Sequence, residues 1–118
     1  MAEPIFNRGG EAQFYIEDKV IYDYAGRPLA FVDGDDIVRY TGKHIGWYCD
    51  GWMRDTSGYA IGFIRSARDG LEMPQLKEPP VTPSSKCPPI PPVARLWPRP
   101  PAFVEKWSVR ILSQFLRG

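Results

Sequence analysis

Large apolar side chains and glycines recur at a fixed spacing through the first half of the chain. Four glycines lie sixteen residues apart, at Gly10, Gly26, Gly42 and Gly58. An aromatic residue follows each glycine after five positions, at Tyr15, Phe31, Trp47 and Phe63. A large aliphatic residue or a methionine precedes each glycine by five positions, at Ile5, Ile21, Ile37 and Met53. A fixed period of this kind predicts a repeat architecture with four copies of one unit.

The polar residues before each glycine predict a tight turn. In the second copy, Asp23 precedes Gly26 by three positions. An aspartate or asparagine hydrogen-bonds to its own backbone in such turns, and glycine accepts the positive φ that closes a hairpin. The same pair recurs in the first and fourth copies, as Asn7 with Gly10 and as Asp55 with Gly58. Arg39 replaces the acid in the third copy, so that turn is the least typical of the four.

A second, shorter turn joins each unit to the next. These turns are rich in acidic residues and glycine, and they fall at residues 17–19, 33–36 and 50–51. Each unit then consists of a strand, a turn, a longer strand and a turn. This pattern predicts eight short strands in four hairpins between about Pro4 and Ala67. A period of sixteen residues is too short for a helical repeat or for a propeller blade of roughly 40 residues.

One face of the longer strands carries small residues. Four positions after the glycine, three of the four copies have a small side chain: Ala30, Gly46 and Gly62. Phe14 is the exception, and the flanking positions in the other copies are bulky. Small residues on one face of a strand indicate that another segment approaches closely there. We expect this face near a central pseudo-fourfold axis, with the repeat aromatics between the hairpins or under the C-terminal part of the chain.

The repeat stops near Met73, and a proline-rich segment follows. Eleven of the thirteen prolines fall between Pro74 and Pro101. Such a segment favours an extended polyproline conformation. Apolar residues nevertheless recur along it, at Leu76, Val81, Ile90, Val93, Leu96, Trp97 and Phe103. We therefore expect an arm that wraps around the repeats, and the alternatives are a mobile arm or a ligand for a partner.

The last residues predict an amphipathic helix. Ser108 is a candidate N-cap ahead of Val109, and Trp107 precedes it as a staple residue. Four residues then form one apolar face, at Ile111, Leu112, Phe115 and Leu116. That face must pack either on its own domain or on another protein. The chain thus divides into a four-hairpin repeat domain (1–69), a proline-rich extended arm (70–106) and a C-terminal amphipathic helix (107–118).

Several local motifs resemble those of a known family. They are the Asx-x-x-Gly turns, the small-aromatic steps Ala30-Phe31 and Gly46-Trp47, the turn Asp50-Gly51-Trp52, and a proline-rich stretch that ends in Trp107-Ser108 before an apolar helix through Phe115-Leu116. In these features the chain resembles a small bacterial family called the four-fold beta flower. The resemblance implies a mostly β fold with four hairpins arranged as petals around an axis, and it implies no particular activity.

Charge and composition narrow the classes of function. Fifteen basic and fourteen acidic side chains give a formal net charge of +1, which argues against a nucleic-acid-binding face. The N-terminus lacks a basic stretch followed by an apolar run, and no apolar stretch approaches the roughly 20 residues of a membrane helix. Cys49 and Cys87 fit no metal-ligand spacing, and we expect reduced thiols. We therefore predict a cytoplasmic protein that binds neither nucleic acid nor membrane.

Three features could carry chemistry, and each has a simpler structural explanation. His44 is the only histidine, so it lacks a second base or ligand, and we expect it in a surface or turn role. Cys49 lies five residues further along one strand, where its side chain points to the opposite face. Asp33, Asp35 and Asp36 lack the downstream bidentate glutamate of a calcium loop, and we expect a solvated hairpin tip. We therefore predict no enzymatic activity, no metal and no cofactor.

Two classes of function remain. The first is a non-catalytic interaction or assembly module that binds a protein partner or a copy of itself. Its candidate contacts are large apolar residues: Trp52, Trp97, Trp107, Ile111 and Phe115. The helix would supply contacts only if it does not pack on its own domain, and for Trp52 a structural role is the simpler explanation. The alternative is a β domain that binds a small ligand or a carbohydrate, at the axis or at a rim where Tyr48 and Trp52 could stack on a sugar.

Overall fold

The structure, a computed structural model, describes residues 2–68, 70–83, 88–90 and 96–117. Its main body consists of eight short antiparallel strands in chain order. They are β1 (Glu3–Phe6), β2 (Ala12–Glu17), β3 (Val20–Asp23), β4 (Pro28–Asp33), β5 (Asp36–Arg39), β6 (His44–Cys49), β7 (Trp52–Arg54) and β8 (Tyr59–Ile64). Two strands fall in each sixteen-residue unit.

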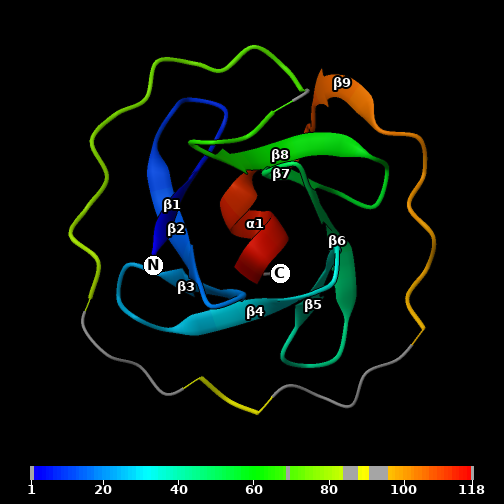
Figure 1. Ribbon diagram of the computed structural model, residues 1–118, viewed down its shortest axis with the longest axis horizontal. Coiled ribbons are helices and arrows are strands. Elements are labelled where there is room, and N and C mark those ends of the chain that lie inside the picture. Colours follow the sequence, from blue (N-terminus) through cyan, green and yellow to red (C-terminus); the bar gives the residue numbers. More distant parts are fainter. Residues whose placement is uncertain (1, 69, 84–87, 91–95, 118) are drawn as a thin grey trace.

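The eight strands form a closed barrel. Each strand pairs with its neighbours in the chain, and β1 also pairs with β8 through Ile5 with Ile64 and Phe6 with Phe63. Figure 1 shows the four hairpins around the helix α1 (Leu112–Arg117), which lies at the centre. The fold is therefore mostly β with one short C-terminal helix, and the predicted fold class is confirmed.

The four glycine loops share one backbone geometry. The four periodic glycines all have positive φ, from +80° at Gly10 to +92° at Gly42. In each loop the glycine N–H donates to the carbonyl three residues before it, and the N–H of that earlier residue donates to the carbonyl four residues after it. The loop at Arg39 makes the same two bonds without an Asx side chain. The conformational freedom of glycine is thus the feature that every loop requires.

Alternating connections give the barrel two different ends. The glycine loops lie at one end of the strands, which we call the loop end, and they point away from α1 in Figure 1. The turns between hairpins lie at the opposite end, which we call the turn end. Residues with left-handed backbone close these turns: Asp18, Lys19, Gly34, Asp50 and Gly51. Aspartate and glycine tolerate this conformation better than most residues.

α1 fills the barrel and completes its core. Leu112, Phe115 and Leu116 are buried among apolar residues of the strands. A Cβ atom at Gly46 would lie 2.8 Å from the Phe115 ring. A Cβ atom at Gly62 would lie 3.1 Å from the Leu112 side chain. The small residues of the longer strands therefore make room for the helix, which is the close approach that the sequence indicates.

The start of the helix differs from the prediction. α1 begins at Leu112 and not directly after Ser108. The Ser108 hydroxyl accepts the N–H of Arg110 and donates to the Asp55 carboxylate, so it stabilises a turn into the barrel and does not cap the helix. Ile111 consequently lies outside the buried face and is 57% exposed.

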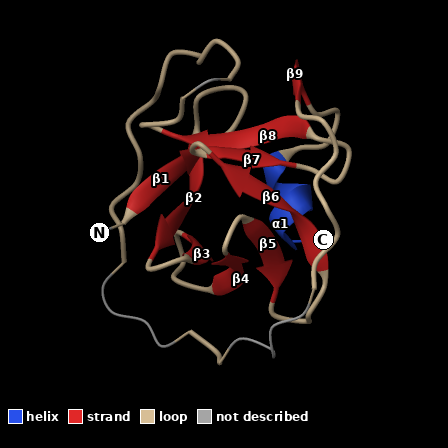
Figure 2. Cartoon of the chain, turned by 45° about the vertical axis from the view of Figure 1, so that its right-hand side comes forward, coloured by secondary structure: helices blue, strands red, loops and turns tan. Residues whose placement is uncertain are grey.

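The proline-rich arm runs around the outside of the barrel, as Figures 1 and 2 show for its described residues. Leu71, Met73 and Leu76 pack against an outer apolar cluster that Phe6 and Phe63 share. Shortly after this contact, the arm donates a backbone hydrogen bond to the first glycine loop, from Lys77 N to Gly10 O. Further along, three apolar side chains are almost fully exposed: Val81, Ile90 and Leu96.

The arm ends in a strand that its proline-rich sequence does not predict. β9 (Val104–Trp107) pairs in parallel with the first residues of β8. β8 offers this edge because its pairing with β1 is confined to Phe63 and Ile64. Residues 104–107 therefore belong to the wall of the barrel, so the extended arm ends before residue 106.

Candidate functional site

The structure divides the five predicted contact residues into buried and accessible ones. Trp52 and Phe115 are each 1% exposed. The Trp52 ring packs on Phe63 and Trp107, and Phe115 lies inside the barrel. Neither can serve as a contact in this structure, because other aromatic rings cover Trp52 and the helix that carries Phe115 packs on its own barrel. The accessible members are the half-buried Trp97 and Trp107 and the exposed Ile111.

Trp97 holds the arm against His44 on the outside of the barrel. The two rings stack with centroids 5.7 Å apart, and Trp97 Nε1–H donates to the Asp33 carboxylate at 2.9 Å. His44 Nε2 lies 2.9 Å from Asp36 Oδ1, and the imidazole also meets the Trp47 ring. The His44 side chain is only 7% exposed, so of the expected surface or turn role the surface part is wrong; His44 begins β6 directly after the third glycine loop. The turn that contains Asp33, Asp35 and Asp36 is also not the solvated hairpin tip that we expected. Asp33 is bonded to Trp97 and Asp36 to His44.

Cys49 lacks the properties of a nucleophile. Burial raises the pKa of its thiol, and the negative charges of Asp50 and Asp35 raise that pKa further. The thiol therefore stays protonated at neutral pH, whereas the thiolate is the reactive form. Cys87 lies outside the described residues.

The C-terminal segment is fastened to the loop end at three hairpins. Ser108 Oγ donates to Asp55 Oδ2 at 2.5 Å. Arg117 Nη2 donates to Asp23 Oδ2 at 3.3 Å, and Arg39 Nη2 donates to the Arg117 carbonyl at 2.8 Å. Asp23, Arg39 and Asp55 occupy the same position of the repeat. This position therefore holds the segment that enters the barrel, and its two aspartates also cap their own loops.

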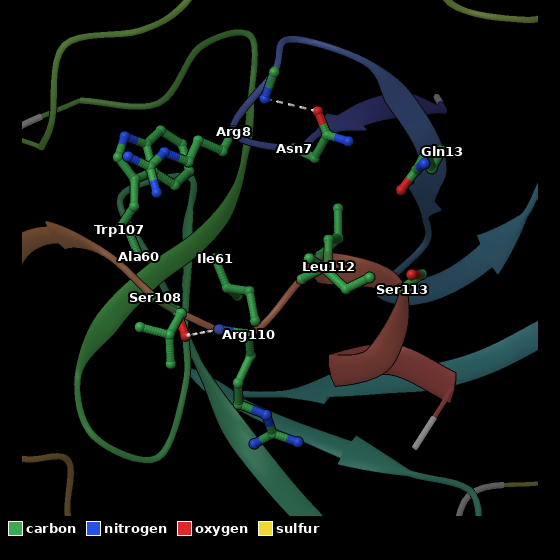
Figure 3. Close-up of a pocket in the computed structure, with 13 residues that line it drawn as sticks. Asn7, Arg8, Gln13, Ala60, Ile61, Trp107, Ser108, Arg110, Leu112 and Ser113 are labelled. Atoms are coloured by element: carbon green, nitrogen blue, oxygen red, sulfur yellow. Dashed lines mark hydrogen bonds between the residues drawn. The ribbon is translucent and has the colours of Figure 1, made fainter.

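The first hairpin borders a pocket of about 330 Å³, which we call the seam pocket. It opens between the first glycine loop, the start of β8 and residues 107–113. Figure 3 shows Asn7, Arg8 and Gln13 on one side and Ile61 and Leu112 on the other. Asn7 stands where the second and fourth hairpins carry an aspartate, and its Oδ1 caps its own loop. The described lining of the seam pocket thus contains two arginines and no carboxylate.

Residues 109–111 form an exposed segment at the edge of the seam pocket. Val109 is 97% exposed and Ile111 is 57% exposed, and the exposed Arg110 lies between them. Ser108 and Leu112 on either side are buried. The segment is therefore held at both ends and presents two apolar side chains and one cation to solvent.

A pocket of about 340 Å³ opens at the opposite end of the barrel, and we call it the turn-end pocket. Its apolar floor consists of Ile16, Val32 and Tyr48, which pack on the main core. Its rim is mostly acidic and consists of Glu3, Asp18, Lys19, Asp35 and Asp50. Burial raises the pKa of the Tyr48 hydroxyl, and the negative charge of Glu3 raises it further, so this residue remains neutral.

Arg54 is a buried, positioning residue that the sequence analysis does not single out. It is 2% exposed, and its guanidinium donates to the Val104 carbonyl at 2.7 Å and to the Glu105 carboxylate at 3.0 Å. These bonds hold β9 against the barrel and so position the whole C-terminal segment. The repeat pattern does mark Arg54 as unusual. The other three units carry an apolar residue at the equivalent position: Phe6, Tyr22 and Val38.

The described residues include neither a helix that could cross a membrane nor a metal-binding cluster. The part of the chain that the structure describes holds no helix of the length and hydrophobicity that a membrane crossing requires. Within the same residues, no group of three or more His, Cys, Asp or Glu side chains is placed to hold a metal ion.

The comparisons with known proteins identify the family. A family model described as 4-fold beta flower protein matches residues 3–116, which include all nine strands and nearly all of α1. No curated protein and no solved structure matches the chain. The matched range agrees with a ring of four hairpins that is completed by the C-terminal segment. The chain therefore belongs to the four-fold beta flower family.

Proposed function

We propose that this chain is a non-catalytic interaction module that binds another protein chain through residues 109–111. The observation that carries the proposal is the exposure of Val109 and Ile111 directly before a helix whose apolar residues fill the barrel. Together with the half-buried Trp107, they line the seam pocket beside polar residues. Exposed apolar groups with polar surroundings mark protein-binding surfaces, and Trp and Arg are enriched in them.

The environment of the titratable residues supports a non-catalytic role. His44 is covered by Trp97 and engaged by Asp36, so a substrate would have to displace the arm to reach it. The raised pKa of Cys49 keeps its thiol protonated. A nucleophile with an oriented base is the arrangement that covalent catalysis needs, and these two residues do not supply it.

The test compares two matched double variants of the full chain. Val109→Ser with Ile111→Ser removes the two exposed apolar side chains, and Val81→Ser with Ile90→Ser removes a valine and an isoleucine that are almost fully exposed on the arm. We expect the first variant to lose association with a protein chain, itself included, by at least about tenfold, and the control to keep it. Equal binding by both variants at unchanged melting temperature would contradict the proposal.

The seam pocket supports a second candidate, a small ligand or a carbohydrate. Its lining combines the Trp107 ring with amide, hydroxyl and guanidinium groups, which is a composition that suits a sugar. A thermal-shift screen with sugars and small carboxylates tests this candidate. We expect a true ligand to raise the melting temperature of the wild type and not that of Gln13→Ala, whose substitution lies in the lining.

A further inference from the structure

We infer that the protein associates head to tail with itself, and that residues 109–111 of one copy enter the turn-end pocket of a second copy. This inference rests on the proposed function, because it names the partner of the same exposed segment. It is carried by three properties of the described residues: the composition of the segment, the composition of the turn-end pocket and the distribution of charge between the two ends.

The segment and the turn-end pocket have matching chemistry. Val109 and Ile111 are apolar and flank the cationic Arg110, whereas the pocket has an apolar floor and a mostly acidic rim. In the inferred complex, the two apolar side chains pack on the floor of the pocket and the Arg110 guanidinium pairs with a carboxylate of the rim. Hydrogen bonds between arginine and carboxylate are among the strongest in interfaces, and arginine loses its hydration more readily than lysine.

The segment is also presented in a fixed conformation. Ser108 is bonded to Asp55 on one side, and Leu112 is buried in the barrel on the other. The Arg110 N–H donates to Ser108 Oγ at 3.1 Å, which fixes the turn between them. Such preorganisation lowers the entropy that is lost when the segment binds.

The two ends of the barrel carry opposite charge. The cations of the loop end are Arg8, Arg27, Arg39, Lys43, Arg54, Lys106, Arg110 and Arg117. Its carboxylates are Glu11, Asp23, Asp55 and Glu105; the two aspartates are buried and already bonded, and Glu105 pairs with Arg54. The turn end carries the carboxylates Glu3, Glu17, Asp18, Asp33, Asp35, Asp36 and Asp50 against the cations Lys19, Arg65 and Arg68. Opposite ends of two copies therefore attract each other, and like ends repel.

The shape of the molecule suits stacking along the barrel axis. It measures 35 × 35 × 22 Å, and the view down the shortest axis in Figure 1 shows the hairpins around α1. A face of this width has room for the roughly 800 Å² that each partner buries in a specific complex. A copy that binds through its loop end keeps its turn end free. Contacts of this heterologous kind produce rings or open stacks and not closed two-fold dimers.

The experiment is sedimentation equilibrium on full-length variants that each block one end. Val109→Asp with Arg110→Glu blocks the loop end, and Glu3→Lys with Asp35→Lys blocks the turn end. Glu3 and Asp35 have no left-handed backbone, so their substitution spares the turns. Leu96→Asp with Arg99→Glu makes the same type of change on the exposed arm and serves as the control. Ile111→Ser is a milder second loop-end variant in case the first does not fold.

We expect the average mass of the wild type and of the control to rise between about 10 μM and about 1 mM. Each blocked variant alone should stay monomeric, and an equal mixture of the two should form a dimer that does not grow. That outcome is specific to head-to-tail contact, since each variant keeps one intact surface. A monomeric wild type, a blocked variant that associates alone, or a mixture that stays monomeric would overturn the inference. If a monomeric wild type still binds a different protein through residues 109–111, the proposed function stands and the head-to-tail inference is wrong.

Discussion

Gly10 and Gly42 hold equivalent positions in their loops, and they differ in what lies over them. A Cβ atom at Gly10 would overlap the carbonyl oxygen of Gln75 in the arm, whereas a Cβ atom at Gly42 would meet nothing within 4 Å. Their φ angles are similar, +80° and +92°. The pair therefore separates the cost of backbone strain from the cost of displacing the arm.

We predict that Gly42→Ala lowers the free energy of unfolding by about 1 kcal/mol, because an alanine resists this φ. Gly10→Ala should cost a further 1–3 kcal/mol or so, because the arm must also move. Urea unfolding of both variants measures the difference. Equal costs would mean that residues 75–77 do not rest on the first glycine loop.

Asp23 makes stability depend on pH in a predictable direction. Burial opposes the ionisation of this carboxyl, but hydrogen bonds and charge from Arg27 and a hydrogen bond from the Ala25 N–H together outweigh it, so the pKa is lowered from 3.8. A folded pKa below the unfolded one means that the stabilisation is present above the unfolded value and is lost as pH falls through the folded value.

We predict that Asp23→Asn lowers stability at pH 7 by about 1–3 kcal/mol, because a charged acceptor for Arg27 and Arg117 is lost. The gap between variant and wild type should narrow as pH falls below about 4. Thermal unfolding across this pH range measures it. A gap that is constant from pH 7 to pH 3 would show that the ionised carboxylate contributes nothing.

Single residues were predictable from sequence where the cause is local. The glycine loops depend on residues three or four positions apart, and their geometry follows from the pattern alone. The burial of His44 depends on Trp97, which reaches it from the arm. No local pattern contains that contact, so the sequence predicts a surface or turn role instead.

At the scale of elements, α1 depends on the barrel that surrounds it. A helix of six residues is too short to be stable alone, so burial of its apolar face must hold it in place. The amphipathic pattern identifies this helix and three of the four residues predicted for its apolar face, the exception being Ile111. Its start could not be predicted, because the bond from Ser108 to Asp55 joins two distant parts of the chain. β9 was missed for the same reason: its partner edge exists only once the barrel has closed.

We predict that Phe115→Ala lowers the free energy of unfolding by about 3–5 kcal/mol, because it leaves a cavity inside the barrel. Ile111→Ala, on the exposed side of the same segment, should change it by less than about 0.5 kcal/mol. Chemical unfolding with a dye that binds apolar surface measures both effects. Similar small effects from the two variants would show that α1 does not occupy the barrel.

At the scale of the whole molecule, a near-neutral net charge conceals a polar distribution. The loop end is mostly cationic and the turn end mostly acidic, although the formal charge of the chain is only +1. The net charge can be counted directly from the sequence. The separation of cations and carboxylates becomes visible only when the glycine loops and the turns between hairpins are placed at opposite ends of the barrel. The composition argument against nucleic acid therefore says nothing about attraction between copies.

We predict that self-association weakens by about tenfold between about 0.05 and 0.5 M salt, because screened charges contribute less to the contact. Sedimentation of the wild type in both buffers measures this change. Association that is unchanged or stronger at high salt would mean that apolar contact alone holds the copies together.

Hydrogen exchange of the wild type at two protein concentrations tests the central claim most directly. That claim assigns residues 112–116 to filling the barrel and residues 109–111 to binding another chain. We expect the amides of Phe115 and Leu116 to be equally protected at about 10 μM and about 1 mM, and those of residues 109–111 to gain protection only at the higher concentration. Rapid exchange of Phe115 at both concentrations, or exchange of residues 109–111 that does not depend on concentration, would contradict the account.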